Sequence, residues 1–307
     1  MATPTTPLIV VVTTGGTIAS TVGADGVSSP TLAGGALVGA AAAEAGVRVR
    51  VVEALRVDSS TLTLDDAWTV VTAVHDALAD PDVAGVVVLH GTDSLEETAY
   101  LLDLHHDDAR PVVLTGSQRT ADHPESDAPA NVHYALWAAA SVTGVVVAFR
   151  GGFVHAAGTA KRHTTELDAF TAPDGPLPRV LLPRADGPWP RVDVVAGYPG
   201  MDGMLLDACV AAGARGIVLQ GLGSGNATPA VVAAVARARE AGVAVVLTTR
   251  VPAGPVATTY GDGGGGADLA AAGAVPAGRL KAGQARVLLA ALLRAGADVA
   301  EGFAARG

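Results

Sequence analysis

Short apolar runs rich in valine alternate along the first half of this chain with longer stretches that carry apolar residues at helical spacing. The apolar runs include "LIVVVTT" from Leu8, "GVVVLHGTD" from Gly85 and "GVVVAFRGG" from Gly144. Strands buried on both faces read as continuous apolar runs, and their alternation with helices is typical of a parallel sheet covered by helices on both sides. This half of the chain therefore predicts an α/β domain.

The alternation breaks between residues 173 and 203, where proline and glycine are dense. It then resumes with "GIVLQGL" and "VAVVLTTRVP" as strands and "KAGQARVLLAALLRAGA" as the final helix. Clusters of proline and glycine mark loops and linkers. We expect a larger amino-terminal domain with a doubly wound, mostly parallel sheet over residues 1–182, a linker over 183–203, and a smaller α/β domain over 204–307.

Capping residues predict where three of the helices begin: Thr63 with Asp66, Ser94 with Glu97, and Thr228 before Pro229. The Ser94 cap would place "HGTD", residues 90–93, in the turn between the end of a strand and the start of a helix. In open parallel sheets, ligands bind at that edge. The turn is therefore a candidate site.

The first predicted strand runs into "TTGGTIAS", residues 13–20. Gly15 and Gly16 allow a sharp turn and a close approach to a ligand, and Thr17 would present its hydroxyl beside main-chain amides. Three interpretations remain open on this motif alone. The first is a phosphate loop, which would need a lysine and a G-x-G-x-x-G spacing that are absent from this motif. The second is a tight turn with a structural role alone. The third is a nucleophilic threonine, which needs an activating partner.

Activating partners of the right type exist elsewhere in the chain. Thr92 and Asp93 follow a predicted strand, and Lys161 lies in the polar segment "GTAKRHTTELDAF". A desolvated lysine can lose its proton and act as a base, oriented by a hydroxyl and a carboxylate. A lone lysine in a loop is more often a solvated surface charge, so spacing alone does not decide between the two interpretations.

Composition excludes several classes of protein. Lys and Arg number 20 against 30 Asp and Glu, with a formal net charge of −10 and no basic run, so nucleic acid is not an expected partner. The single cysteine, Cys209, and the spacing of the histidines offer no metal site, and no cofactor is expected. No apolar segment is long enough for a membrane span and no signal peptide is visible, which predicts a cytoplasmic protein.

Two motifs resemble family signatures. "TTGGTIAS" resembles the amino-terminal signature of the bacterial-type L-asparaginase and glutaminase-asparaginase family, and "VVVLHGTDSLEETAYLL" resembles its second signature. The likeness continues through "PVVLTGSQR", "SDAPANVHYAL", "TAKRHTTELDAF" and "GIVLQGLGSGN" over nearly the whole chain. The resemblance implies a cofactor-free amidohydrolase that converts L-asparagine to L-aspartate and ammonia through an acyl-threonine. It also implies a homodimer or homotetramer with sites at the subunit interface.

The resemblance further implies a role for each matching residue. Thr17 matches the threonine that attacks the side-chain amide, and Thr92, Asp93 and Lys161 match the residues that complete the catalytic set. The matching substrate-binding positions are Gly16, Ser59, Ser60, Gly91, Ser117 and Asn226, the last of them supplied by the neighbouring subunit.

The chain departs from the family pattern at three places. The segment "TVGADGVSSPTLAGGAL" lacks the tyrosine that activates the nucleophile in relatives, Gly266 stands at the position of an intersubunit glutamate, and Ser60 replaces a frequent glutamine. These differences favour activation by Thr92, Asp93 and Lys161. Three alternative functions remain open. The protein could be an amidase for L-glutamine or another short amide, or a catalytically weak relative that binds a ligand. It could also be the amide-hydrolysing subunit of a tRNA-dependent amidotransferase.

Overall fold

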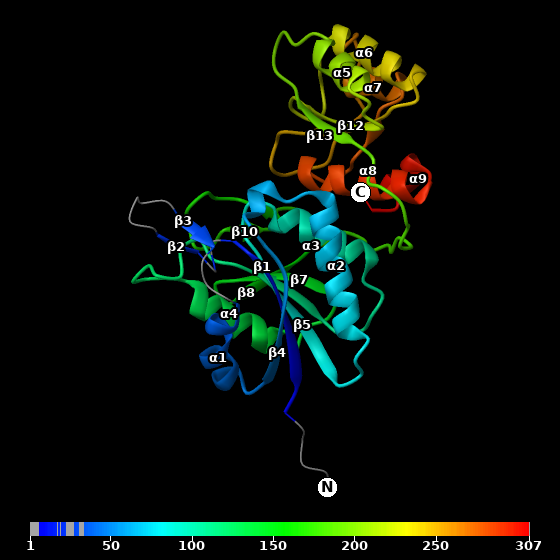
Figure 1. The fold of residues 1–307 in the computed structure, drawn as a ribbon. Coiled ribbons are helices and arrows are strands. Elements are labelled where there is room, and N and C mark those ends of the chain that lie inside the picture. The colour runs from blue at the N-terminus through cyan, green and yellow to red at the C-terminus, as the bar shows by residue number, and fades with distance from the viewer. Residues whose placement is uncertain (1–5, 17, 19, 23–27, 31–33, 307) are drawn as a thin grey trace. The chain divides into compact units, whose positions relative to one another are not determined.

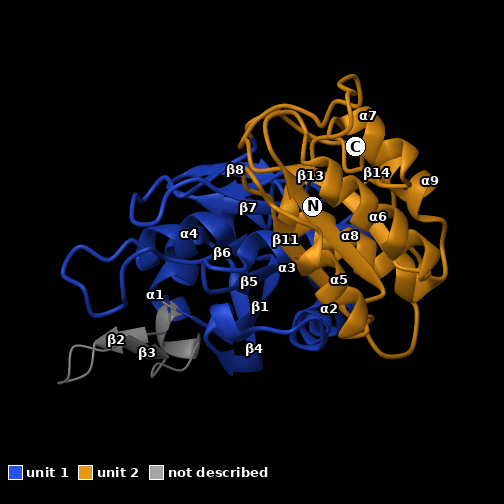
Figure 2. Ribbon diagram, turned by 90° about the horizontal axis from the view of Figure 1, so that it is seen from above, with its two compact units in different colours: residues 1–172 blue, residues 173–307 orange. Residues whose placement is uncertain are grey.

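The computed structural model describes residues 6–16, 18, 20–22, 28–30 and 34–306. Their contacts divide the chain into two compact units, residues 1–172 and 173–307 (Figure 2). Each unit has a sheet and a hydrophobic core of its own.

The first unit contains a six-stranded sheet of order β4-β1-β5-β6-β7-β8. All neighbouring strands are parallel except β7 and β8, which are antiparallel. The strands are β1 (Leu8–Gly15), β4 (Arg48–Val57), β5 (Val83–Leu89), β6 (Val112–Thr115), β7 (Val145–Phe149) and β8 (Gly152–His155). The prediction of a mostly parallel, doubly wound sheet is confirmed.

Helices cover both faces of this sheet (Figure 1): α1 (Gly34–Ala45) and α4 (Ala128–Ala138) lie on one face, α2 (Leu64–Leu78) and α3 (Leu95–His105) on the other. Alternate strand residues such as Ile9 and Val11 pack against α1 and α4. Because both faces of the central strands are covered, all residues of β5 from Gly85 onward are buried. Two short hairpins complete the unit: β2 (Ser20–Val22) with β3 (Ser28–Pro30), and β9 (Ala160–Lys161) with β10 (Phe170–Thr171).

The second unit contains a four-stranded parallel sheet, formed by β11 (Val192–Ala196), β12 (Gly216–Gly221), β13 (Ala244–Thr249) and β14 (Val275–Pro276). One face packs against α5 (Met204–Ala211), α6 (Pro229–Glu240) and α7 (Gly266–Ala271). The other face packs against α8 (Ala282–Ala295), which contacts α9 (Val299–Ala304).

The division into units falls earlier than the expected end of the first domain at residue 182. Asp174 already belongs to the second unit, because its carboxylate accepts the N–H of Gly254 and its carbonyl accepts a hydrogen bond from Arg279. The segment expected as a linker, 183–203, contains β11, which pairs with β12 over its whole length. The proline- and glycine-rich segment therefore contains a strand of the second sheet as well as irregular chain.

Two of the three predicted caps are confirmed, and one is wrong. Thr63 forms a reciprocal capping box with Asp66, and Thr228 caps α6 by accepting the N–H of Val231. Helix α3 begins after Ser94 as expected, yet Ser94 makes no capping hydrogen bond. Its hydroxyl donates to the carbonyl of Ser59 at 2.6 Å, which ties the start of α3 to the loop after β4.

Among the described residues, no helix is both long enough and apolar enough to cross a membrane.

Candidate functional site

The parallel strands of the main sheet in the first unit end side by side, so the residues that follow them share one edge of the sheet. Gly15 at the end of β1 pairs with Val57 at the end of β4, and Leu89 pairs with Thr115 where β5 and β6 end. Ligands of open parallel sheets bind outside this edge. Thr17, the predicted nucleophile, follows β1 there but lies outside the described residues, so its role stays a prediction.

The loops after β1 and β5 touch through their backbones. A Cβ atom on Gly16 would lie 2.4 Å from the Cα of Gly91, and Gly16 also has a positive φ of 80°. A Cβ on Gly91 would lie 2.4 Å from the Oγ of Ser59. Side chains at either glycine would push these loops apart. The structure therefore brings three of the predicted substrate-binding positions together: Gly16, Ser59 and Gly91. Gly16 is the residue that precedes Thr17 in the sequence.

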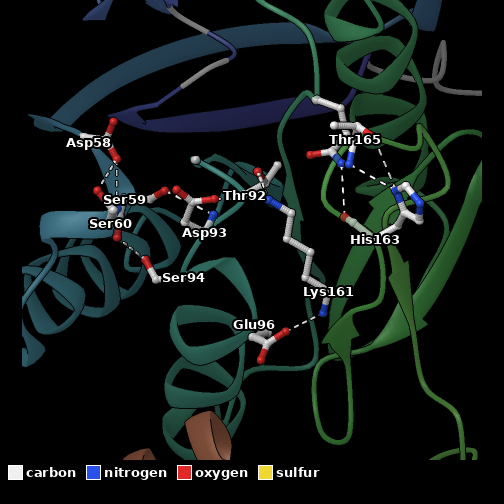
Figure 3. Close-up of polar contacts among 12 residues, drawn as sticks. Asp58, Ser59, Ser60, Thr92, Asp93, Ser94, Glu96, Lys161, His163 and Thr165 are labelled. Carbon is white, nitrogen blue, oxygen red and sulfur yellow. Dashed lines mark hydrogen bonds and ion pairs between the residues drawn. The ribbon is translucent and has the colours of Figure 1, made fainter. Parts of the chain in front are cut away.

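Lys161 joins this edge from the β9 hairpin (Figure 3). Its Nζ donates to the Oγ1 of Thr92 at 2.8 Å and lies 3.1 Å from Oδ1 of Asp93. The Lys161 side chain is only 21% exposed, whereas that of Asp93 is 57% exposed. Lys161 is thus not a solvated surface charge, and three of the four predicted catalytic residues form one hydrogen-bonded cluster.

Ser59 and Ser60 face different surroundings in the short 3-10 turn after β4. Ser59 is buried, and its Oγ accepts the backbone N–H of Asp93 at 3.2 Å. The Ser60 hydroxyl is exposed and donates to Oδ1 of Asp58 at 2.8 Å. Ser59 therefore belongs to the Thr92 and Asp93 cluster, while the hydroxyl of Ser60 is engaged by Asp58.

Ser117 lies in the turn after β6. It is fully buried, and its hydroxyl donates to the carbonyl of Arg119 at 2.7 Å. Asp127, just before α4, accepts the N–H groups of Gln118 and Arg119, each at 3.0 Å. The side chain of Gln118 donates to the carbonyl of Glu166 at 3.0 Å, so this turn is also linked to the segment after Lys161.

His90 precedes the two site residues Gly91 and Thr92 and is completely buried. Its Nδ1 lies 2.7 Å from the carbonyl oxygen of Gly91. Because a carbonyl can only accept, Nδ1 carries the proton. Burial lowers the pKa of His90 to about 4, so the ring is neutral near pH 7. A neutral ring that holds the Gly91 carbonyl stiffens the turn.

Glu96, in the first turn of α3, was not among the residues selected from the sequence. Its carboxylate accepts the backbone N–H of Lys161. Burial raises the pKa of this carboxyl, while the N–H and the charge of Lys161 oppose the rise. Glu96 and Gln118 bond to main-chain groups that are 65 and 48 residues away in sequence, and no local pattern signals such contacts.

Asn226 lies in the second unit, in the turn after β12. Its Oδ1 accepts the N–H of Gly266 at 3.1 Å. A Cβ on Gly266 would lie 2.4 Å from the carbonyl oxygen of Ala257, so this backbone excludes any side chain at the position of the family's glutamate. The predicted contribution of Asn226 to a neighbouring subunit's site stays a prediction.

The arrangement around Lys161 is an amine, a hydroxyl and a carboxylate within hydrogen-bonding distance. Such a set can move a proton to or from a neighbouring nucleophile. Within the described stretches of the chain, no group of three His, Cys, Asp or Glu side chains is placed to hold a metal ion.

Comparisons with known proteins point to one family. The family model described as asparaginase, N-terminal, matches residues 8–185, and the glutaminase/asparaginase C-terminal domain matches residues 191–302. The chain is 36% identical over 309 aligned positions to an L-asparaginase of Bacillus licheniformis, covering 93% of this chain and 95% of that protein. It is 38% identical over 235 positions to a probable L-asparaginase of Deinococcus radiodurans, covering 69% of this chain and 72% of the relative.

A solved structure is also similar. The crystal structure of a probable cytoplasmic L-asparaginase from Campylobacter jejuni matches with a TM-score of 0.82 and 27% identity, covering 97% of this chain and 99% of that one. Both domain models match in order along one chain, and the relatives align over most of its length. The chain therefore belongs to the asparaginase family.

Proposed function

We propose that this protein hydrolyses the side-chain amide of L-asparagine to give L-aspartate and ammonia. The observation that carries the proposal is the contact of Lys161 Nζ with Thr92 and Asp93 at the edge where β1 and β5 end. Similarity to proteins named L-asparaginase over 93% of the chain supports the choice of substrate.

In the proposed reaction, the hydroxyl of Thr17 attacks the amide carbon of the substrate. Its proton passes through the Thr92 hydroxyl to the neutral form of Lys161, which returns a proton to the departing ammonia. The acyl-threonine is then hydrolysed by water, which regenerates the Thr17 hydroxyl. Main-chain N–H groups near Gly16 and Thr92 are the proposed donors to the oxyanion, where one donor is worth about 3 kcal/mol in other enzymes.

The remaining site residues bind the ends of the amino acid in this proposal. Asp93 is exposed and pairs with the α-ammonium, while the buried Ser59 hydroxyl, held by the Asp93 N–H, donates to the α-carboxylate. The backbones of Gly16 and Gly91, with Ser60 and Ser117, line the pocket. A homodimer or homotetramer supplies Asn226 from a second subunit, and the proposed location is the cytoplasm.

Ammonia release from purified protein tests the proposal, with L-asparagine, L-glutamine and D-asparagine as substrates. Turnover of L-asparagine should exceed that of L-glutamine. Both Thr17→Ala and Lys161→Met should lower kcat about a thousandfold or more, since removing a nucleophile or its proton acceptor has effects of that size.

The second lysine of the chain, Lys281, lies in the second unit and provides a matched control as Lys281→Met. That variant should keep wild-type activity. Amide hydrolysis that survives Thr17→Ala would contradict the nucleophile assignment, and preferential turnover of L-glutamine would replace the proposed substrate.

A further inference from the structure

Lys161 is carried by a strand that is not part of the main sheet. Strand β9 has two residues and pairs with β10 in a two-stranded hairpin, in which Lys161 faces Phe170. Thr92, in contrast, follows β5 in the middle of the six-stranded sheet. The hydrogen bonds of the main sheet therefore do not set the distance between the lysine backbone and Thr92.

Glu96 connects the two parts directly. It lies in the first turn of α3, four residues after Thr92, and its carboxylate accepts the backbone N–H of Lys161. The other end of the same lysine, Nζ, bonds to Thr92 and Asp93. Figure 3 shows Glu96 at the backbone end of Lys161 and the Thr92 hydroxyl at its tip. One short segment, residues 92–96, thus holds the lysine at both ends.

The hydrogen bond between the Glu96 carboxylate and the Lys161 N–H belongs to a strong class of hydrogen bonds. A hydrogen bond to a carboxylate is charge-assisted, and a carboxylate that is removed from water is costly unless it is bonded. Burial disfavours the charged form of Glu96, as its raised pKa shows, and the Lys161 N–H opposes that effect. An acidic residue in a first helical turn also stabilises the helix itself. The experiment must separate that general effect from the contact with Lys161.

We propose that Glu96 is a positioning residue for catalysis, because it fixes the backbone of Lys161 so that the amine reaches Thr92. This inference rests on the proposed function for its kinetic consequence, but the geometric claim stands apart from it. Displacing a catalytic group by about 1 Å can cost a hundredfold in rate. In this role the Glu96 carboxylate acts through the main chain of Lys161, whose N–H it accepts.

Kinetics of two variants test the role. Glu96→Ala should lower kcat by about tenfold to a hundredfold with little change in KM. Glu96→Gln keeps an oxygen that can accept the N–H, and its kcat should stay within about threefold of the wild type. Asp65→Ala is the matched control, because Asp65 is an exposed acidic residue in the first turn of α2. It should leave kcat unchanged.

Lysine NMR provides a readout that does not need activity. The chain contains two lysines, Lys161 and Lys281, so protein labelled at the lysine ε-carbon gives two side-chain signals. The Lys161 signal should shift and broaden in Glu96→Ala but not in Glu96→Gln or Asp65→Ala, and the Lys281 signal should stay in place. The Lys281→Arg variant lacks the Lys281 signal, which assigns the remaining NMR signal to Lys161.

Several outcomes would overturn the proposal. One such outcome is a wild-type kcat in Glu96→Ala. A second is an equal loss of kcat in Glu96→Gln and Glu96→Ala. A third is a Lys161 NMR signal that does not move in a folded Glu96→Ala protein. If Glu96→Ala does not fold, the Glu96→Gln signal and kcat still decide, since both must match the wild type. A protein without asparaginase activity whose Lys161 signal moves as expected would refute the proposed function alone.

Discussion

His90 is a buried imidazole at the centre of the candidate site, and its environment makes stability depend on pH. Burial lowers its pKa to about 4 in the folded protein from an ordinary value of 6.5. Above pH 6.5 the ring is neutral in both the folded and the unfolded chain, so it adds no pH dependence. Below that value the His90 imidazole is protonated in the unfolded chain but stays neutral in the folded protein until the pH falls to about 4. The free energy of unfolding therefore falls as the pH is lowered.

Replacing His90 by asparagine tests this statement. The asparagine amide can still donate to the Gly91 carbonyl, but it does not titrate. Between pH 7 and pH 4 the wild type should lose about 3 kcal/mol more unfolding free energy than His90→Asn, because folding lowers the His90 pKa from 6.5 to about 4. Denaturant unfolding across this range measures the difference. Equal pH slopes for the two proteins would show that His90 titrates normally.

At the scale of the elements, helix starts and strand ends position the side chains of the site. Helix α3 carries Glu96 to the β9 hairpin, and Ser94 at its start bonds to the loop after β4 instead of capping the helix. The start of α4 holds the turn after β6 through Asp127 and Asn131. Short polar contacts between neighbouring elements thus fix the loops that the sheet alone leaves free.

The start of α4 allows a specific prediction. Asp127→Ala removes the acceptor of two backbone N–H groups in the turn that holds Ser117, and each bond to a charged group is worth about 1.5–3 kcal/mol. We expect a loss of about 3 kcal/mol in unfolding free energy and a raised KM, because the Ser117 turn loosens.

Asp127→Asn should show an intermediate loss, since one side-chain oxygen remains. Thermal or chemical unfolding and steady-state kinetics measure both quantities. An unchanged KM in Asp127→Ala would mean that the turn is held without this carboxylate.

At the scale of the whole molecule, the proposed site depends on association of identical chains. Thr92 and Lys161 belong to the first unit, and Asn226 belongs to the second. In the proposal Asn226 completes the site of a neighbouring subunit. Two-fold symmetric dimers form two equivalent sites, each with residues from both chains.

Mixing two inactive variants tests this arrangement. In a hybrid of Thr17→Ala and Asn226→Ala subunits, one of the two sites has both residues intact. Random exchange should therefore restore about a quarter of the wild-type activity, whereas each variant alone stays inactive. The rate of ammonia release after subunit exchange measures the recovered activity, and sedimentation confirms that the mixed protein is oligomeric. No recovery in mixed oligomers would place Asn226 and Thr17 of one chain in the same site.

Much of the site could be predicted from the sequence because its chemistry is concentrated in strand ends. Thr92 and Asp93 follow an apolar run and precede a helix, so the sheet edge could be inferred from periodicity. The contact of Lys161 with them needed the resemblance, since 68 residues separate Lys161 from Asp93. Ser94 was misjudged because a hydroxyl at a helix start can bond to another loop when one lies close.

The alternation of strands and helices, the parallel sheets and two of the helix caps could be read from the amino-acid sequence, because they follow from local periodicity and residue type. Three features needed the folded chain: the partly buried contact of Lys161 with Thr92, the bond from Glu96 to the Lys161 backbone, and the division of the compact units after Ala172. Those outcomes depend on hydrogen bonds and burial between segments distant in sequence. Such contacts form only when the sheet has brought the loops together.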